Sequence, residues 1–365
     1  MSATVAGRRA EAAGEVPVLR RLSALDRFLP AWILGAMALG IILGRLWPGI
    51  GGALGRWQIR QVSIPIAVGL LWMMYPVLAK VRYERISALA RDWRMMATSL
   101  ALNWIVGPAL MFALAWLLLP DEPAFRTGLI LVGLARCIAM VLIWNQLAGG
   151  DGEYAAVLVA VNSVFQIVSY AGLAYFYVAV LPGWLGLPQQ TVSISPTTVA
   201  ASVGVFLGVP LLAGFATRLW LSRARGLAWY EQRFLPRIGP TALWGLLFTI
   251  VVMFALKGNT ITAIPLPVAR IMVPLLAYFA LMFTLSFLGG RLLGFPYPKT
   301  ATLAFTAASN NFELAIAAAV AVFGIGSGQA LAAVVGPLVE VPVLVGLVYL
   351  ALWAGPRLFS DAPAA

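Results

Sequence analysis

The stretch Gly133 to Asn145, which reads G-L-A-R-C-I-A-M-V-L-I-W-N, decides how this chain must fold. It lies inside a long apolar segment, yet it holds Arg136 and Cys137, the single cysteine of the chain. An arginine near the centre of a bilayer costs at least about 2.5–3.5 kcal/mol, so it is retained where it faces a polar path or pairs with another group. We therefore expect this stretch to be half of a transport site, with Ala308–Glu313 as the other half.

The composition is that of a protein with many membrane crossings. Of its 365 residues, 62% are hydrophobic and 10% are charged, whereas a soluble domain is nearer half apolar and a quarter charged. A single cysteine excludes an intrachain disulfide and a metal cage of several thiolates. The chain has no histidine, the commonest metal ligand and the usual general base near neutral pH. We therefore expect no cofactor, and a proton carrier within the membrane has to be a carboxylate.

Ten apolar segments are each long enough, at about 18 residues or more, to span a bilayer. They cover residues 29–47, 62–80, 95–119, 126–148, 153–181, 197–220, 238–257, 268–293, 300–324 and 329–355. The net charge of +12 comes from Lys and Arg in the intervening loops and not from a nucleic-acid surface. Eighteen of these residues fall on the side of the N-terminus and six on the other, which predicts cytoplasmic termini. Residues 1–28 and 356–365 are expected to be cytoplasmic tails of one transmembrane transporter domain, residues 29–355.

A weak internal repeat divides the chain into residues 29–181 and 197–355. Ile64-Pro65 matches Gly239-Pro240, and Arg126-Thr127 matches Lys299-Thr300, with similar spacing. Five spans in each half is an odd number, so the halves have opposite orientations, as in the inverted repeats of secondary transporters. The alternative is an accidental resemblance between apolar helices. The predicted fold is thus an all-α polytopic membrane protein with two inverted five-helix repeats.

The fourth and ninth spans are predicted to be discontinuous helices that cross. In the alignment of the two halves, Ala135-Arg136-Cys137 corresponds to Ala308-Ser309-Asn310, so both spans are polar at the same depth. Neighbouring residues of a regular helix point about 100° apart, so the polar side chains after Ala308 converge only if the helix is interrupted. Interrupted helices offer their free ends to ligands. Asn310 and Asn311 are candidate substrate contacts; hydrogen bonding between helices is the alternative.

Two acids within the spans, Glu313 and Glu340, are candidates for proton coupling. A carboxylate removed from water is easier to protonate, so Glu313 is expected to bind and release a proton during transport. A static ion pair between Glu313 and Arg136 is the alternative. Glu340 lies between Pro337 and Pro342, where helix packing explains it as well as a site does.

Cys137 is a candidate substrate ligand. A lone cysteine in apolar surroundings usually behaves as a small hydrophobe. An adjacent arginine and a helix end both favour the thiolate, which suits thiophilic centres. Asn162 and Gln166, in the fifth span, add neutral donors and acceptors that serve either the substrate or helix packing.

Four segments carry a resemblance to a known family: Gly133–Val141 with Trp144-Asn145, Met74–Glu84, Asn310–Ala317 and Gly336–Leu344. Over about residues 25–355 the chain resembles the Acr3-type arsenite efflux permeases. The resemblance implies ten helices, the fold of the bile-acid/sodium symporter-like superfamily, and proton-coupled extrusion of trivalent arsenic through a bacterial inner membrane. It also implies an essential cysteine at Cys137, as the ligand of arsenic(III), and an essential glutamate at Glu313.

The residues and the resemblance predict the same mechanism. Arg136, Asn310 and Asn311 hydrogen-bond the oxygens of arsenite, Cys137 contacts arsenic, and Glu313 exchanges a proton as arsenite leaves. Whether antimonite is a second cargo stays open.

Three other functions are alternatives to arsenite efflux. A sodium symporter for an organic anion is the nearest, because the oxygens of Asn310, Asn311 and Glu313 can also ligate sodium. An enzyme is not expected, since the chain lacks the histidines of a metalloprotease and the motif of an intramembrane serine protease. A membrane receptor is a further alternative, and it predicts no substrate flux.

Overall fold

The computed structural model describes residues 28–47, 49, 58–59, 62–81, 92–138, 140–188, 196–256, 265–324 and 326–360. Most of these residues form helices, and a small antiparallel pair consists of β1 (Gln58–Ile59) and β2 (Val62–Ser63). Nearly all of the predicted N-terminal tail lies outside the described residues. The last helix continues to Leu358, past the predicted start of the C-terminal tail.

The described helices follow the predicted spans closely. Those of the first half are α4 (Leu29–Leu46), α6 (Ile64–Ala79), α8 (Trp93–Ala101), η2 (Leu102–Val106), α9 (Gly107–Leu118), α10 (Pro123–Leu134), α11 (Met140–Leu147), α12 (Gly152–Tyr175), η3 (Phe176–Val180) and α13 (Leu181–Trp184). Those of the second half are α14 (Pro196–Val203), η4 (Gly204–Gly208), α15 (Val209–Arg225), α16 (Leu227–Trp229), η5 (Tyr230–Phe234), α17 (Leu235–Ile238), α18 (Thr241–Leu256), α19 (Pro265–Leu292), α20 (Tyr297–Ala308), α21 (Phe312–Phe323) and α22 (Gly328–Leu358). Within the described ranges, six continuous helical segments are long and apolar enough to cross a membrane, and four shorter ones are also apolar.

Prolines explain the four π-helical turns, η2 to η5. Each turn ends two residues before a proline, and these prolines are Pro108, Pro182, Pro210 and Pro236. A proline has no N–H to donate, and its ring collides with the carbonyl four residues earlier. A single wider turn relieves this collision without ending the helix. The spans therefore stay continuous although each contains a proline.

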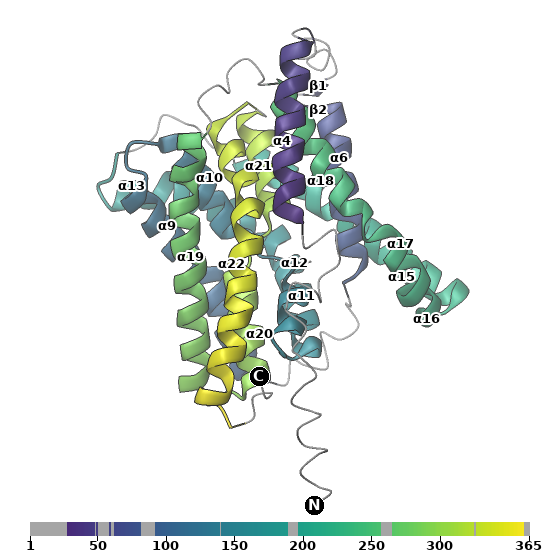
Figure 1. Cartoon of the computed structure of the whole chain (residues 1–365), viewed down its shortest axis with the longest axis vertical. Helices are drawn as coiled ribbons and strands as arrows, with labels where there is room; N and C mark the ends of the chain where they lie inside the picture. The colour runs from purple at the N-terminus through teal and green to yellow at the C-terminus, as the bar shows by residue number, and fades with distance from the viewer. Residues whose placement is uncertain are drawn as a thin grey trace, which may run out of the picture.

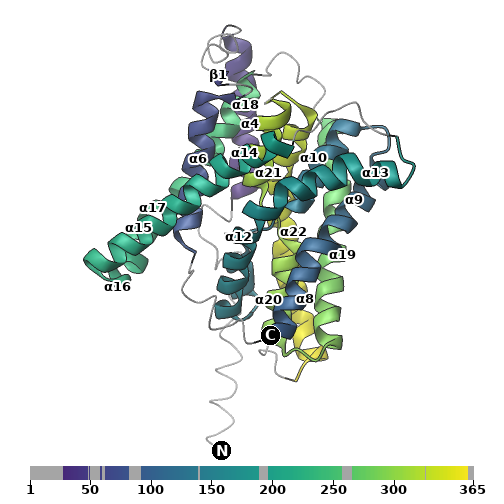
Figure 2. The same cartoon turned by 180° about the vertical axis from the view of Figure 1, so that it is seen from behind.

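The helices form two groups. The first group, α4, α6, α15, α17 and α18, packs together on one side of the molecule, and the second contains α8 to α12 and α19 to α22 (Figure 1). Helix α14 packs against α12 and α21 of the second group, and the chain then continues as α15 into the first group (Figure 2). The broken helices both belong to the second group.

Glycines allow the helices of the first group to approach closely. A Cβ added to Gly40 of α4 would lie 2.6 Å from the carbonyl oxygen of Val251 in α18. One added to Gly245 of α18 would lie 2.9 Å from the backbone nitrogen of Met73 in α6. Small residues at helix contacts are typical of membrane proteins, because packing and not water exclusion holds helices together in lipid.

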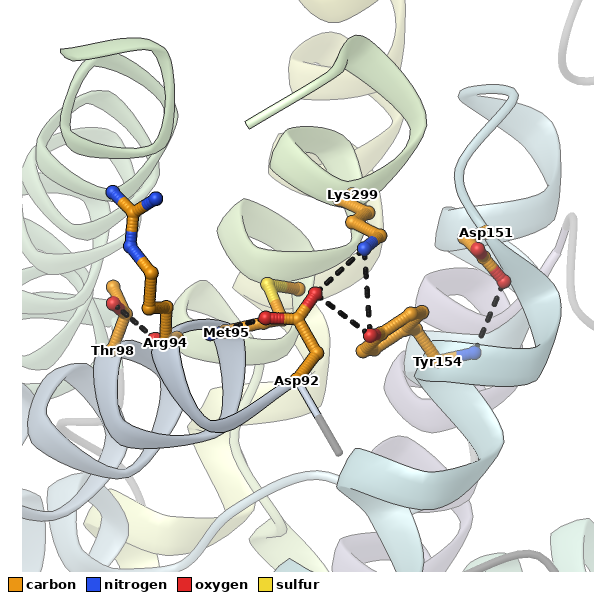
Figure 3. Close-up of polar contacts among 7 residues, drawn as sticks. All are labelled: Asp92, Arg94, Met95, Thr98, Asp151, Tyr154 and Lys299. Carbon is orange, nitrogen blue, oxygen red and sulfur yellow. Dashed lines mark hydrogen bonds and ion pairs between the residues drawn. The ribbon is translucent and has the colours of Figure 1, made fainter. Parts of the chain in front are cut away.

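A polar cluster joins the first turns of three helices in the second group (Figure 3). The Asp92 carboxylate, at the start of α8, accepts hydrogen bonds from Lys299 Nζ at 2.6 Å and from the Tyr154 hydroxyl at 2.9 Å. The backbone N–H of Asp151, which caps α12, donates to the carbonyl of Pro298 at 3.1 Å. These contacts fix the start of α20, and thereby the depth at which that helix breaks.

Candidate functional site

The two broken helices meet at their breaks. Helix α10 ends at Leu134 and α11 begins at Met140, while α20 ends at Ala308 and α21 begins at Phe312. The extended segments between them run antiparallel, with Arg136 opposite Asn310. The backbone N–H of Asn311 donates to Ala135 O at 2.9 Å, and that of Cys137 to Ser309 O at 3.4 Å. The predicted interruption of spans four and nine is confirmed.

The pairing of the two breaks differs by one residue from the equivalence in the repeat. The repeat sets Arg136 against Ser309 as equivalent residues, whereas the structure pairs Arg136 with Asn310 across the breaks. The motif matches of the repeat are compatible with offsets between the two halves that differ by one residue. The apolar residues of the helices do not favour one of these offsets over another. The two hydrogen bonds between the breaks fix the register instead.

Arg136 and Asn310 each donate side-chain hydrogen bonds to carbonyl groups at the end of the opposite half-helix. Asn310 Nδ2 donates to the carbonyls of Val132, at 2.9 Å, and Ala135, at 3.2 Å, at the end of α10. Arg136 Nη1 donates to Ala307 O, at 3.3 Å, at the end of α20, and to the Tyr278 hydroxyl at 2.9 Å. The last carbonyls of a helix lack partners within the helix and carry partial negative charge. A guanidinium and an amide are thus suited to these positions.

The backbone N–H groups of the pair interact with two long helices of the group, α12 and α22. Arg136 N–H donates to Gln166 Oε1 in α12 at 2.9 Å, and the N–H of Asn310 interacts with the Glu340 carboxyl group in α22. The separation in sequence between Arg136 and Asn310 equals that between Gln166 and Glu340, so the two contacts are equivalent in the two halves of the chain. Both predicted residues, Gln166 and Glu340, therefore belong to the crossing.

Several buried polar atoms remain without a hydrogen-bond partner among the residues that the structure describes. At the crossing these atoms are Arg136 Nε and Nη2, Ser309 Oγ, Asn310 Oδ1, Asn311 Nδ2 and Glu340 Oε1. Leaving a buried donor or acceptor unpaired costs about 1–3 kcal/mol. The crossing thus offers both donors and acceptors on buried side chains. A small ligand with several oxygens matches such a set.

Three predicted residues have positions that sequence reasoning did not foresee. Asn311 caps α21, since its Oδ1 accepts from Leu314 N–H at 3.0 Å. Asn162 contacts the crossing indirectly, because its side chain binds Trp104 and its carbonyl accepts from Gln166 Nε2 at 3.2 Å. Glu313 lies in the first turn of α21 and is half-buried.

The alternative of an ion pair between Arg136 and Glu313 is not seen. Among the described residues, the guanidinium of Arg136 has the neutral partners Tyr278 and Ala307, although its side chain is fully buried. Glu313 instead lies close enough to Glu340 for their carboxyl groups to interact electrostatically. The crossing therefore contains one cation and two neighbouring acids that are not paired with it.

A cavity of about 620 Å³ reaches the first break, where Ile138 lines it. It lies between the two groups of helices, with Lys80 and Glu231 on one side and Glu153 and Ile138 on the other. Ile138 directly follows Cys137, which is 6% exposed. The cavity thus reaches the residue that follows Cys137, whereas the guanidinium of Arg136 contacts Tyr278 in α19.

Sequence reasoning missed Tyr278 and Trp104. Tyr278 is fully buried and holds the guanidinium of Arg136, and Trp104 donates to Asn162 Oδ1 at 3.1 Å. Both aromatic residues occur in apolar spans, where a tyrosine or tryptophan is ordinary. The available signal was the repeat, which places Trp104 and Tyr278 at equivalent positions of its two halves.

Comparison with known proteins identifies the family. The arsenical-resistance protein Acr3 of Corynebacterium glutamicum is 55% identical over 343 residues, which cover 94% of this chain and 93% of that protein. The chain belongs to the Acr3 family of arsenical-resistance proteins. Acr3 of Alkaliphilus metalliredigens is 33% identical, with 88% of this chain and 91% of that protein covered. An uncharacterized transporter of Synechocystis, slr0944, is 35% identical, with 90% and 88% covered.

A broader family contains the Acr3 proteins. The model of the Sodium Bile acid symporter family matches residues 67–264. The matched range includes the first break and ends before the second one. This Acr3-family chain is accordingly an arsenical-resistance transporter with several membrane crossings.

Proposed function

We propose that this Acr3-family chain exports arsenite from the cytoplasm in exchange for protons, and thereby confers resistance to arsenic. The observation that carries the proposal is the crossing of the two breaks, with its unpaired donors and acceptors around Arg136 and Asn310. At neutral pH arsenite is a small trihydroxide, which both donates and accepts hydrogen bonds. Arg136 Nε and Nη2 bind its oxygens, and Asn310 Oδ1 and Ser309 Oγ bind its hydroxyl groups.

Cys137 binds the arsenic atom weakly. Thiolates are preferred ligands of thiophilic centres, but a single sulfur cannot form the three-thiolate cage that would hold arsenic(III) tightly. A transporter has to release its cargo, so one ligand beside a cavity is suited to the task. Antimonite has the same hydroxide chemistry and is expected to compete for the site.

Glu313 carries the coupled proton, with Glu340 as its neighbour. Glu313 is the more accessible of the two acids, since it is half-buried whereas Glu340 is 4% exposed. In this scheme Glu313 takes a proton from outside as arsenite leaves, and it loses that proton to the cytoplasm when the next arsenite binds. No step is enzymatic, and no cofactor takes part.

The architecture proposed with this function has ten crossings in two inverted repeats, with helices α10/α11 and α20/α21 as the broken pair. The excess of Lys and Arg supports cytoplasmic termini. The bacterial relatives support an inner-membrane location. The cavity beside Cys137 then opens to the cytoplasm, because Lys80 and Glu231 lie at cytoplasmic helix ends.

Arsenite uptake into everted membrane vesicles tests the proposal. The wild-type chain is expected to accumulate arsenite when a proton gradient is imposed, and Glu313→Gln is expected to abolish that dependence. Glu122→Gln, which alters an acid paired with Arg270 away from the crossing, is expected to transport normally. Undiminished proton-driven uptake by Glu313→Gln would remove Glu313 from the coupling step.

A sodium symporter for an organic anion is the second candidate. The family match and the unpaired oxygens of Ser309, Asn310 and Glu340 favour it, since sodium prefers oxygen ligands. The same vesicles separate the two functions. Uptake that requires a sodium gradient and ignores a pH gradient would establish the symporter.

A further inference from the structure

A small cavity of about 10 Å³ lies where α9, α10 and α13 come together (Figure 1). Its lining includes Trp116 of α9, Arg126 and Thr127 in the first turns of α10, and Pro182 of α13. One water molecule needs about 10–15 Å³ of such space. The cavity therefore admits one small particle and no larger molecule.

Two buried N–H donors remain unused at this cavity. The Arg126 side chain donates through Nη1 to the carbonyls of Leu119, at 3.3 Å, and Pro120, at 2.9 Å. Neither Arg126 Nε nor Trp116 Nε1 has a hydrogen-bond partner among the described residues. The guanidinium lies over the indole ring, with Arg126 Cζ 3.6 Å from the ring centroid. The two donors thus belong to side chains in direct contact.

The charge of Arg126 lacks a counter-ion in the described part of the chain. Arg126 is only 3% exposed, and none of the described ion pairs includes it. Asp121 and Glu122 precede it closely in the sequence, but both form ion pairs with Arg270 of α19. Because a buried charge is costly unless it is paired, a negative partner for Arg126 is expected.

The other broken helix has its own counter-ion. Lys299, which matches Arg126 in the sequence repeat, pairs with the carboxylate of Asp92 before α8 at 2.6 Å. The repeat makes α19 the counterpart of α8. The first turn of α19 contains no acid, and this helix contributes the cation Arg270 instead. The carboxylate that serves Lys299 thus has no equivalent beside Arg126.

Charge and size favour a small anion over water. A water molecule could accept both hydrogen bonds, but it would leave the charge of Arg126 uncompensated. The N-terminal end of α10, a helix of 12 residues, carries partial positive charge and adds to the attraction for an anion. Oxyanions with three or four oxygens, arsenite included, need several times the available space. A monovalent ion such as chloride meets both requirements.

We propose that this cavity binds one small monovalent anion of the size of chloride, held by Arg126 Nε and Trp116 Nε1 at the start of α10. The anion is the counter-ion of Arg126 and fixes the first turn of the first broken helix, as Asp92 does for the second. It is distinct from the transported cargo, and its binding depends on neither arsenite nor protons.

Thermal unfolding of the purified chain in detergent tests the proposal, with chloride replaced stepwise by gluconate at constant ionic strength. The wild-type unfolding temperature is expected to rise with chloride and then level off. The rise is about 3–5 °C at about 100 times the dissociation constant. Bromide is expected to replace chloride, whereas sulfate is too large to do so.

Two variants at the cavity locate the effect. Arg126→Gln is expected to lose the chloride response, because it removes the buried charge. Trp116→Phe keeps an aromatic ring but lacks the indole N–H, so the half-saturating chloride concentration is expected to increase about 2- to 12-fold. If Arg126→Gln fails to fold, Trp116→Phe decides the matter by itself.

The matched controls are Arg45→Gln and Trp93→Phe, which make the same changes at exposed side chains. Both are expected to keep the wild-type response. A wild-type chain that unfolds equally in chloride and gluconate would overturn the proposal, since the cavity would then hold only water. Equal stabilisation by sulfate, a full chloride response in Arg126→Gln, or an unchanged half-saturating concentration in Trp116→Phe would also overturn it.

Discussion

The first break, between α10 and α11, and the second break, between α20 and α21, have the same backbone arrangement and different side chains. Each contributes an extended segment, a side chain that binds the end of the opposite half-helix, and an N–H bound from a long helix. The first break has Arg136, Cys137 and Gln166 where the second has Asn310, Asn311 and Glu340. The backbone symmetry therefore builds the crossing, and the side-chain asymmetry gives it chemistry: a cation and a thiol face an amide and acids.

Making the first break resemble the second is expected to have the largest effect. Arg136→Asn removes the buried guanidinium but keeps a donor for Ala307. We expect arsenite transport at low concentration to fall about 10- to 150-fold, because a hydrogen bond to a charged group is worth about 1.5–3 kcal/mol. Initial rates of vesicle uptake measure this. Normal transport by Arg136→Asn would mean that the asymmetry at this position is irrelevant to the cargo.

The two long helices differ one turn before these residues. Before Gln166, α12 has Asn162, whereas before Glu340, α22 has Gly336. A Cβ on Gly336 would overlap the ring of Phe312, the first and fully buried residue of α21. Gly336→Ala is expected to destabilise the protein by about 1–3 kcal/mol through overpacking and to displace the second break. Thermal unfolding in detergent measures the change. Gly346→Ala, on the same helix with open space around it, is the control and is expected to be neutral.

Replacing each of the two acceptors, Gln166 and Glu340, separates an effect on stability from an effect on proton coupling. Gln166→Leu leaves the N–H of Arg136 unpaired and is expected to cost about 1–3 kcal/mol of stability. Glu340→Gln keeps an acceptor for Asn310, so it is expected to change stability little while altering the pH dependence of transport. Unfolding temperatures and uptake rates at several pH values test both variants. The comparison fails if Glu340→Gln is the more destabilising of the two.

The smallest expected effect concerns how the half-helices begin. The first turn of α20 contains Lys299, which forms an ion pair with Asp92, whereas the first turn of α10 contains Arg126, which donates to the carbonyls of Leu119 and Pro120. The Lys299 ammonium holds the pKa of Asp92 below its ordinary value of 3.8, and the Tyr154 hydroxyl adds to the effect while partial burial opposes it.

A depressed pKa means that this contribution to stability is present above about pH 4 and is lost as the pH falls through the lower, folded value. Asp92→Asn is expected to lower stability at neutral pH by about 0.2–1 kcal/mol, since the pair is partly exposed. Near pH 3 the difference between the variant and the wild type is expected to shrink. A difference that grows on acidification would contradict this assignment.

Much of the crossing could be predicted because polar residues in apolar spans are costly and hence conspicuous. Arg136, Asn310, Gln166 and Glu340 were all found in this way, and they do contact one another at the breaks. The partners of these residues could not be found by the same reasoning. The residue type of Tyr278 gave no signal, because an aromatic residue with one hydroxyl is common in membrane helices.

The role of Asn311 shows a second limit. An asparagine before an apolar run fits a helix cap and a ligand contact equally well in the sequence. Its Oδ1 is bound to Leu314 N–H, so only its Nδ2 is left for other partners. Whether Asn311 caps the helix or binds a ligand depends on where the helix begins, and a shift of that start by one residue changes the answer.

The sequence by itself determined that this chain crosses a membrane many times, that two of its spans are interrupted, and which residues make the interruptions polar. These properties follow from the local cost of placing charges, prolines and polar groups in lipid, which is read residue by residue. The tertiary structure decided the register of the two breaks, the partners of Arg136 and the cavity beside Cys137. Each of these depends on contacts between helices that are far apart in the chain, where shape and hydrogen-bond geometry select one arrangement among many that are equally apolar.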